Sequence, residues 1–174
     1  MAKAYVLISC ETGADVNVIS NLKHIPTVKE AHGTLGSYDV LAKLESESDF
    51  ELNQDISKKI RQLKKIRATL TLQTDGKDHF EKKLKPAEKD VVESHMATAY
   101  VMINCWQDEK LNVLESMSKI PEVIDGDIIL GPFEIICKVA APTYNDISGI
   151  ISQKIRKLKT IKSTMTLNVI PENE

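Results

Sequence analysis

The chain has 174 residues, of which 42% are hydrophobic and 28% are charged, and its formal net charge is -2. This length allows one medium-sized domain or two small ones, each with an apolar core. The nearly balanced charge excludes the strong overall positive field of a dedicated nucleic-acid-binding protein. No apolar run approaches the roughly 20 residues that cross a bilayer, so we expect no membrane-spanning role.

The first predicted elements are a strand and a helix. Residues 5–10 are apolar and rich in β-branched side chains, a pattern that predicts a buried strand. Val16, Ile19 and Leu22 then recur at three-residue steps and give a helix one apolar face. Pro26 ends this helix, because a proline disfavours the helical conformation of the residue before it.

Two strands, a second helix and a last strand follow. Residues 28–35 and 38–44 are predicted strands, joined by a tight turn at Gly36, where a positive φ suits glycine. Apolar residues at helical spacing predict the second helix over 52–63, and residues 66–73 are the last predicted strand. The order βαββαβ is that of the ferredoxin-like arrangement, an antiparallel sheet with both helices on one face.

The same elements recur 95 positions later. About 24 of about 72 aligned positions are identical without a gap, and further pairs, such as Tyr38 with Phe133 and Val40 with Ile135, exchange one apolar residue for another. Between the copies, residues 75–96 are rich in Lys, Glu and Asp, which predicts a charged linker that is helical in part. The predicted domains are therefore residues 1–74 and 97–174.

Each predicted unit leaves one face of its sheet without helices. An open apolar sheet face in a unit of about 70 residues favours association with a partner of the same kind. The predicted fold class is therefore α+β, with tandem ferredoxin-like βαββαβ units packing sheet to sheet as a (pseudo)dimeric α/β barrel.

The cysteines and the N-terminus indicate where the protein works. None of the three cysteines lies in a CxxC motif, and no basic and apolar leader precedes the first strand, so we expect a reducing, cytoplasmic location. Cys10, Cys105 and Cys137 fall in or at the end of predicted strands, where small apolar packing is the usual role. Metal ligation would need His24 or His32 to converge on them. We therefore predict no metal and no cofactor.

Two stretches of the first unit resemble a known family. Gly36-Ser37-Tyr38-Asp39 looks like a Gly-x-Tyr-Asp motif, and residues 66–72 are similar to a closing Val-x-x-Thr-x-Thr strand. Both occur in the effector-binding (RAM) domain of Lrp/AsnC regulators, which also exists as a stand-alone protein. The resemblance covers both units and leaves out the linker. It implies dimeric α/β barrels that assemble into rings, with small effectors, mostly amino acids, bound between dimers.

The resemblance also implies which residues bind the effector. A carboxylate can pair with an α-ammonium, and threonine hydroxyls and turn N–H groups can bond an α-carboxylate. The implied positions are Gly36, Tyr38, Asp39, Thr69 and Thr71 in the first unit, and Gly131, Phe133, Glu134, Thr164 and Thr166 in the second.

The same residues also have purely structural explanations. Threonine is favoured in strands because it is β-branched, carboxylates beside a turn are often only solvated, and the turn itself requires the glycines. In the second copy, Pro132 and Phe133 replace Ser37 and Tyr38, which removes a backbone donor and a phenol hydroxyl. Its site therefore fits the family pattern less well.

The resemblance predicts a sensor of a small molecule, an amino acid above all. Full regulators of the family carry an N-terminal helix-turn-helix, whereas this chain begins at the first strand, so we expect no direct DNA binding. The expected partners are the effector, further copies of the chain in a homo-oligomer, and full-length Lrp/AsnC regulators.

Two alternatives come from other functional classes. Barrels of this topology also serve as enzymes such as small monooxygenases, but no histidine or arginine repeats on an inward strand position. Lys43, repeated as Lys138, is expected to extend its amine to solvent or to pair near the turn carboxylates. We therefore predict no catalytic residues and no enzyme.

The other alternative is a nucleic-acid-associated surface on the basic second helices. A solvated helix face is the commoner meaning of such a charge run, and no aromatic residues interleave with the cations, so base stacking is not expected. The cations are Lys58, Lys59, Arg61, Lys64 and Lys65, and then Lys154, Arg156, Lys157 and Lys159.

Overall fold

The computed structural model describes residues 1–172, which form two compact units. Unit 1 comprises Met1–Gly76 together with the segment that starts at Ile170, and unit 2 comprises Lys77–Val169. Each unit has the predicted βαββαβ order, so the tandem ferredoxin-like fold class is confirmed. How the two units pack on each other stays a prediction.

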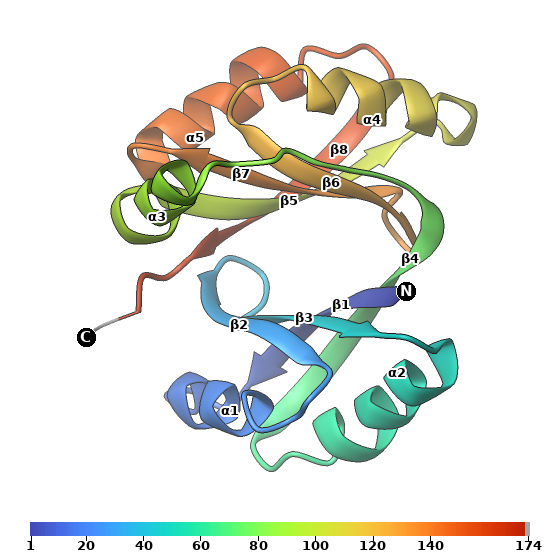
Figure 1. Ribbon diagram of the computed structural model, residues 1–174, viewed down its shortest axis with the longest axis vertical. Coiled ribbons are helices and arrows are strands. Elements are labelled where there is room, and N and C mark those ends of the chain that lie inside the picture. The colour runs from blue at the N-terminus through green and yellow to red at the C-terminus, as the bar shows by residue number, and fades with distance from the viewer. Residues whose placement is uncertain (173–174) are drawn as a thin grey trace. The chain divides into compact units, whose positions relative to one another are not determined.

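Unit 1 is an antiparallel sheet with helices on one face (Figure 1). Its strands are hydrogen-bonded in the order β4-β1-β3-β2. Its elements are β1 (Ala2–Cys10), α1 (Asp15–Leu22), β2 (Val28–Leu35), β3 (Val40–Ser46), α2 (Asp49–Asp55), the π-helical turn η1 (Ile56–Ile60) and β4 (Ile66–Glu81), of which residues 66–76 belong to this unit.

The core of unit 1 lies between the sheet and its helices. Alternate residues of β1 and β3, such as Val6, Ile8 and Val40, point to this side and are fully buried. Val18 of α1 and Leu52 of α2 belong to the same cluster. Burial of an aliphatic side chain of this size contributes about 1.5–3 kcal/mol. The alternating residues of the strands and the residues at helical spacing therefore form the two sides of one core.

Unit 2 repeats this arrangement, with strand order β8-β5-β7-β6. A buried cluster that includes Val101, Ile103, Val113 and Met117 fills the space between its sheet and helices. Its elements are β5 (Ala97–Cys105), the 3-10 turn η2 (Gln107–Glu109), α4 (Lys110–Ser118), β6 (Val123–Leu130), β7 (Ile135–Ala141), α5 (Tyr144–Ile150), the π-helical turn η3 (Ile151–Ile155) and β8 (Ile161–Val169).

The segment predicted as a charged linker is largely regular structure. Strand β4 continues to Glu81, and helix α3 spans Pro86–His95, with the proline at its first position, where no N–H is needed. In unit 2, the Lys82 N–H donates to the Ile124 carbonyl at 2.9 Å, so the residue that follows β4 lies beside β6. Charge content alone did not distinguish an exposed strand from a flexible linker.

A second segment covers the edge of β2 in unit 1. The Ile170 N–H donates to the Gly33 carbonyl at 2.8 Å, and the Lys23 ammonium lies 2.9 Å from a carboxylate oxygen of Glu172. A strand edge left open can pair with another chain, and a covering segment prevents this. No pattern in the sequence predicted that residues after β8 would cover this edge.

Candidate functional site

Asp39, the predicted ligand carboxylate of unit 1, is held at the tip of the β2–β3 hairpin by backbone hydrogen bonds. Its N–H donates to the Ile8 carbonyl at 2.8 Å, and its Oδ2 accepts from the Cys10 N–H at 2.9 Å. The Thr34 N–H donates to the Asp39 carbonyl at 2.8 Å. Asp39 is nevertheless exposed, so its carboxylate is fixed in place and open to solvent.

The same bonds explain why β3 begins at Val40 and not at the predicted position 38. The hydroxyl of Thr34 donates to the Tyr38 carbonyl at 2.8 Å, so residues 38 and 39 close the turn instead of extending the strand. Gly36 and Gly131 have φ angles of 146° and 130°, in the region that favours glycine. The prediction that the turn requires these glycines is confirmed.

Glu134, the equivalent carboxylate of unit 2, is held by the same backbone bonds and by one more partner. Its N–H donates to the Ile103 carbonyl at 3.0 Å, and its Oε2 accepts from the Cys105 N–H at 3.2 Å. In the orientation that satisfies both of its amide atoms, Asn104 also donates to Glu134 Oε2 at 3.0 Å and accepts from the Ser163 hydroxyl at 3.2 Å. Glu134 is half-buried, so it is less available to a ligand than Asp39.

The predicted threonines lie on the last strand of each unit. Thr69 and Thr71 are paired with Ile8 and Val6 of β1, so their side chains share the face that the helices cover. The Thr71 hydroxyl is buried and has no hydrogen-bond partner within residues 1–172. A buried hydroxyl without a partner costs about 1–3 kcal/mol. In unit 2 the hydroxyl of Thr164, the equivalent of Thr69, accepts a 3.0 Å bond from Arg156 Nε.

The hairpin residues and the threonines do not meet in one pocket of a unit. Gly36, Tyr38 and Asp39 lie at the β2–β3 turn, on one side of β1, whereas Thr69 and Thr71 lie on β4, on its other side. Neighbouring strands are about 4.8 Å apart, so about two strand spacings separate the groups. Unit 2 repeats this separation between its hairpin and β8.

A buried cysteine lies beside each hairpin carboxylate. Burial first, and then the negative charge of Asp39, raise the pKa of the Cys10 thiol. Burial and the charge of Glu134 raise the pKa of the Cys105 thiol in the same way. Burial also places the pKa of Cys137 well above its usual value. All three belong to the apolar clusters, which confirms their predicted packing role.

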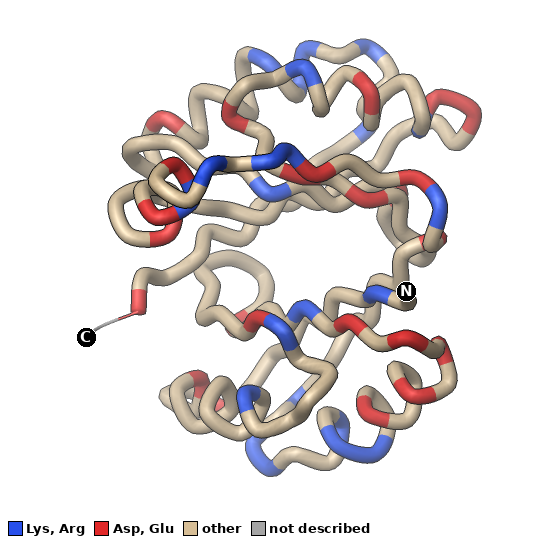
Figure 2. Tube along the Cα trace, in the orientation of Figure 1, with Lys and Arg blue, Asp and Glu red and all other residues tan. Residues whose placement is uncertain are grey.

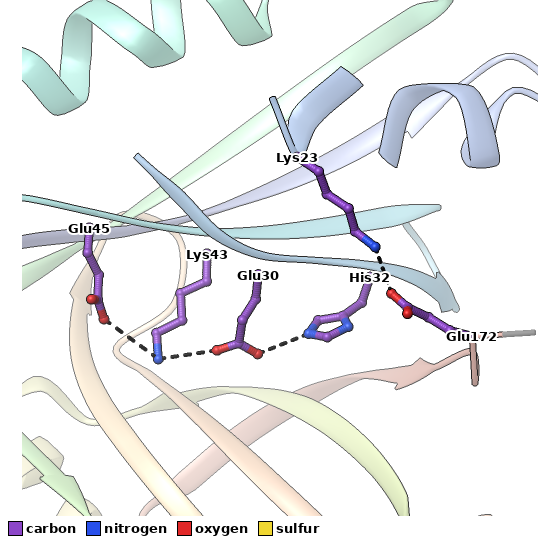
Figure 3. Close-up of polar contacts among 6 residues, drawn as sticks. All are labelled: Lys23, Glu30, His32, Lys43, Glu45 and Glu172. Carbon is purple, nitrogen blue, oxygen red and sulfur yellow. Dashed lines mark hydrogen bonds and ion pairs between the residues drawn. The ribbon is translucent and has the colours of Figure 1, made fainter. Parts of the chain in front are cut away.

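A row of charged side chains on the helix-free face of unit 1 was not predicted as a site. Figure 3 shows Glu30 between His32 and Lys43. A Glu30 oxygen lies 3.0 Å from His32 Nε2, the other lies 3.5 Å from the Lys43 ammonium, and Glu45 lies 3.9 Å from that ammonium. The expectation that Lys43 pairs near the turn carboxylates is therefore wrong. Glu30 and His32 are two residues apart on a strand and so share a face, which is the signal that could have revealed them.

Two kinds of feature are not found in residues 1–172. No helix there combines the length and the apolar character needed to cross a membrane. In the same residues, no three His, Cys, Asp or Glu side chains lie close enough together to hold a metal ion.

Comparison with known proteins identifies the repeated unit. A family model described as the Lrp/AsnC ligand binding domain matches residues 3–73 and again residues 98–172. An uncharacterized HTH-type transcriptional regulator of Pyrococcus furiosus is 33% identical over 73 residues, which are 40% of this chain and 49% of the relative. A similar regulator of Pyrococcus abyssi is 30% identical over the same shares. The chain thus spans about half the length of the curated relatives it matches.

Solved structures that cover nearly the whole chain correct one prediction. The siroheme decarboxylase NirDL matches 96% of this chain and 70% of its own, with a TM-score of 0.68 and 10% identity. An anthrone oxidase-like protein matches 97% of this chain and 90% of its own, with a TM-score of 0.60 and 8% identity. These likenesses show the fold alone. They still contradict the prediction of no enzyme, because proteins named for catalysis share this fold over nearly the whole chain.

Proposed function

The chain belongs to the Lrp/AsnC ligand-binding domain family, and we propose that it is a cytoplasmic sensor of an amino acid. It acts through oligomerisation or through a partner regulator of the same family, not by reading operator DNA itself. The observation that carries this proposal is the match of a ligand-binding family model to both units, over residues 3–73 and 98–172. The curated relatives, named as transcriptional regulators, support a role in regulation.

Asp39 is the residue to which we assign the α-ammonium of the effector. One carboxylate oxygen, Oδ2, accepts the bond from the Cys10 N–H, and the side chain is exposed, so a charged ligand can reach it. Charge-assisted hydrogen bonds of this kind are about twice as strong as neutral ones. Gly36 allows close approach of the ligand to the turn, and Tyr38 contributes a phenol hydroxyl.

Thr69 and Thr71 are assigned to the α-carboxylate, and their distance from Asp39 links binding to assembly. The ammonium and carboxylate of one amino acid are much closer together than two strand spacings of about 4.8 Å each. A ligand held by the hairpin of one copy would therefore meet the threonines of a second copy. Binding would then favour the assembled state, because a ligand shifts an equilibrium toward the state it binds better.

A thermal-shift screen against the common amino acids tests this proposal. Ligand present at 100 times its Kd stabilises the native state by about 2.7 kcal/mol, which raises the melting temperature. We expect one amino acid or a few related ones to give this shift, and Asp39→Asn to abolish it. Glu134→Gln is the matched control and should leave it intact. If no amino acid of the panel raises the melting temperature of the wild-type protein, amino-acid sensing is contradicted.

Catalysis is a second candidate, favoured by the charged row on the helix-free face of unit 1. Glu30 contacts both His32 and Lys43, and the Lys43 side chain is only 14% exposed. A carboxylate that orients an imidazole is a common arrangement for proton transfer near neutral pH. Such a row would suit removal or addition of a proton on a carboxylated small molecule.

Mass spectrometry of candidate substrates incubated with the protein tests this second candidate. Carboxylated tetrapyrroles are the first class to try, because the decarboxylase of similar fold has also been solved with an iron-uroporphyrin analogue. Turnover that is lost in His32→Gln and kept in His24→Gln would support catalysis at the row. Turnover unaffected by His32→Gln would place the chemistry elsewhere.

A further inference from the structure

Two equivalent segments hold much of the positive charge of the chain and none of its acids. Residues 56–67 contain six of the 23 Lys and Arg residues, and residues 151–162 contain five. Neither segment contains Asp or Glu. The chain is acidic overall, with a net charge of -2, so these segments are local basic surfaces on an otherwise acidic protein.

The fold turns these cations outward. Each segment begins with a π-helical turn, closed by the bond from the Arg61 N–H to the Ile56 carbonyl at 3.0 Å and by the equivalent bond from Arg156 to Ile151 at 2.8 Å. Ile60 and Ile155 are fully buried and anchor the two turns. The lysines and arginines of both segments are exposed. Figure 2 marks the positions of the Lys and Arg residues along the chain. The apolar residues thus attach each segment to its unit, and the charged residues face solvent.

Few of these cations are neutralised within residues 1–172. Lys59 pairs with Asp55 at 3.1 Å and Lys154 pairs with Glu122 at 2.8 Å. Arg156 donates to the Thr164 hydroxyl, which is uncharged. No carboxylate lies within 4.0 Å of the ammonium groups of Lys157 or Lys159 in this part of the chain. A cluster of exposed cations without acidic partners repels itself and attracts an anionic partner.

In unit 2 an aromatic ring lies beside the basic segment, which the sequence order does not reveal. Trp106, the only tryptophan of the chain, is 56% exposed, and its backbone N–H donates to the Thr160 carbonyl at 3.3 Å. The Lys162 ammonium lies 4.0 Å from the centre of its ring. No aromatic residue lies among these cations in the sequence, as expected, but the fold brings Trp106 next to them.

The equivalent position of unit 1 carries a carboxylate. Glu11 aligns with Trp106, and its N–H makes the same kind of bond, to the Lys65 carbonyl at 2.8 Å. The backbone is therefore alike in the two units, while the side chain differs between an aromatic ring and an acid. An acid beside the cations weakens attraction to a polyanion, whereas a ring adds a stacking surface.

We propose that unit 2 binds single-stranded nucleic acid, without sequence preference, on the surface formed by Trp106, Arg156, Lys157, Lys159 and Lys162, which we name the basic–aromatic surface. The cations contact the phosphates, and one base stacks on the part of the Trp106 ring that Lys162 leaves open. Proteins that bind single strands in this way combine a basic track with aromatic side chains. The proposal goes beyond effector sensing and does not depend on Asp39. It also differs from operator reading, because no base edges are recognised.

The single tryptophan makes its own fluorescence a direct probe of this surface. We expect saturable quenching when the full-length protein is titrated with an unlabelled oligothymidylate of about a dozen nucleotides, because a stacked base quenches the indole. The apparent affinity should fall steeply as salt is raised. Heparin, which has charge but no bases, should bind without comparable quenching.

Variants measured by anisotropy of a labelled oligothymidylate complete the test. Trp106→Glu, which gives unit 2 the side chain of unit 1, should weaken binding by about tenfold or more, since one stacked base contributes about 1–3 kcal/mol. Lys157→Gln with Lys159→Gln should weaken binding and lower the salt dependence. Lys58→Gln with Lys64→Gln, on unit 1, is the matched control and should change affinity less than about threefold.

Two results would overturn the proposal. One is the absence of oligothymidylate binding at low salt by the wild-type protein. The other is binding that Trp106→Glu leaves unchanged and that heparin matches, which would mean that the surface is a general polyanion or acidic-protein contact. Because the substituted residues are exposed, circular dichroism of each variant should match that of the wild type.

Discussion

Lys59 of unit 1 and its equivalent Lys154 of unit 2 each pair with a carboxylate. The two carboxylates come from different elements of the fold. In unit 1, Asp55 at the end of α2 is 6% exposed, accepts a 2.7 Å bond from the Thr27 hydroxyl and lies 3.1 Å from Lys59. In unit 2, the position of Asp55 is Ile150, and Glu122 takes the position of Thr27 and binds Lys154 at 2.8 Å. Unit 1 thus relies on a buried polar pair, whereas unit 2 relies on a more exposed ion pair above an apolar core.

The largest effect expected from this difference is the loss of Asp55. Asp55→Ala removes the partner of a buried hydroxyl and of Lys59, and we expect it to lower the free energy of unfolding by about 2–4 kcal/mol. Glu122→Ala removes a pair whose lysine is 45% exposed and should cost about 1 kcal/mol or less. Urea unfolding of the full chain, followed by circular dichroism, measures both. Equal losses would mean that the two arrangements do not differ in energy.

Exchange of the two arrangements sharpens the comparison. The double variant Thr27→Glu with Asp55→Ile gives unit 1 the side chains of unit 2, with Lys59 already in place as the equivalent of Lys154. We expect this double variant to be more stable than Asp55→Ile alone, by about 1 kcal/mol or more, because neighbouring residues couple in this range. If the losses of stability of the two single variants simply add in the double variant, the backbones of the units differ too much for the exchange.

A smaller loss of stability than that of Asp55→Ala is expected from changing a glycine that only unit 2 requires. A Cβ added to Gly126 would lie 2.6 Å from a ring atom of Phe80, whereas unit 1 already has Ala31 at the equivalent position. Gly126→Ala should therefore destabilise the protein by about 1–3 kcal/mol through overpacking, as seen in thermal unfolding. Phe80→Leu, which shortens the side chain, should recover part of this loss in the double variant. No loss in Gly126→Ala would mean that Phe80 moves aside freely.

The smallest expected effect concerns pH. A hydrogen bond from Lys154 lowers the pKa of Glu122 below its usual value of 4.5. A lowered folded-state pKa stabilises the protein above pH 4.5, and this contribution is lost as the pH falls through the folded-state pKa. The difference in unfolding free energy between wild type and Glu122→Gln should be about 0.3–1 kcal/mol at pH 7 and should shrink as the pH falls below 4.5. A difference that stays constant would exclude the ion pair as its cause.

The fold could be predicted from the sequence because each element carries its own local signal. Buried strands such as β1 are continuous apolar runs, the helices have one apolar face, and the repeat shows every signal twice. The segment after Gln73 could not be assigned, because its residues alternate only weakly and their strand conformation depends on pairing with a distant edge. The edge contact of Ile170 is invisible in sequence for the same reason.

The candidate site could be predicted only in part. The glycine turn and its carboxylate are adjacent in sequence, so one motif locates both. The bond from Cys10 to Asp39, the contact of Glu30 with Lys43 and the contact of Lys162 with Trp106 join residues that are far apart in the sequence. Such contacts depend on strand order and register, which a single sequence does not specify residue by residue.

The measurement that tests the central claim most directly is calorimetric titration of the full chain with the amino acid that gives the largest thermal shift. Asp39 is exposed, whereas Glu134 is half-buried and is also bound by Asn104. We therefore predict one ligand bound per chain, with binding lost in Asp39→Asn and kept in Glu134→Gln. Two ligands per chain, or binding that survives Asp39→Asn, would contradict the assignment of the effector site to unit 1.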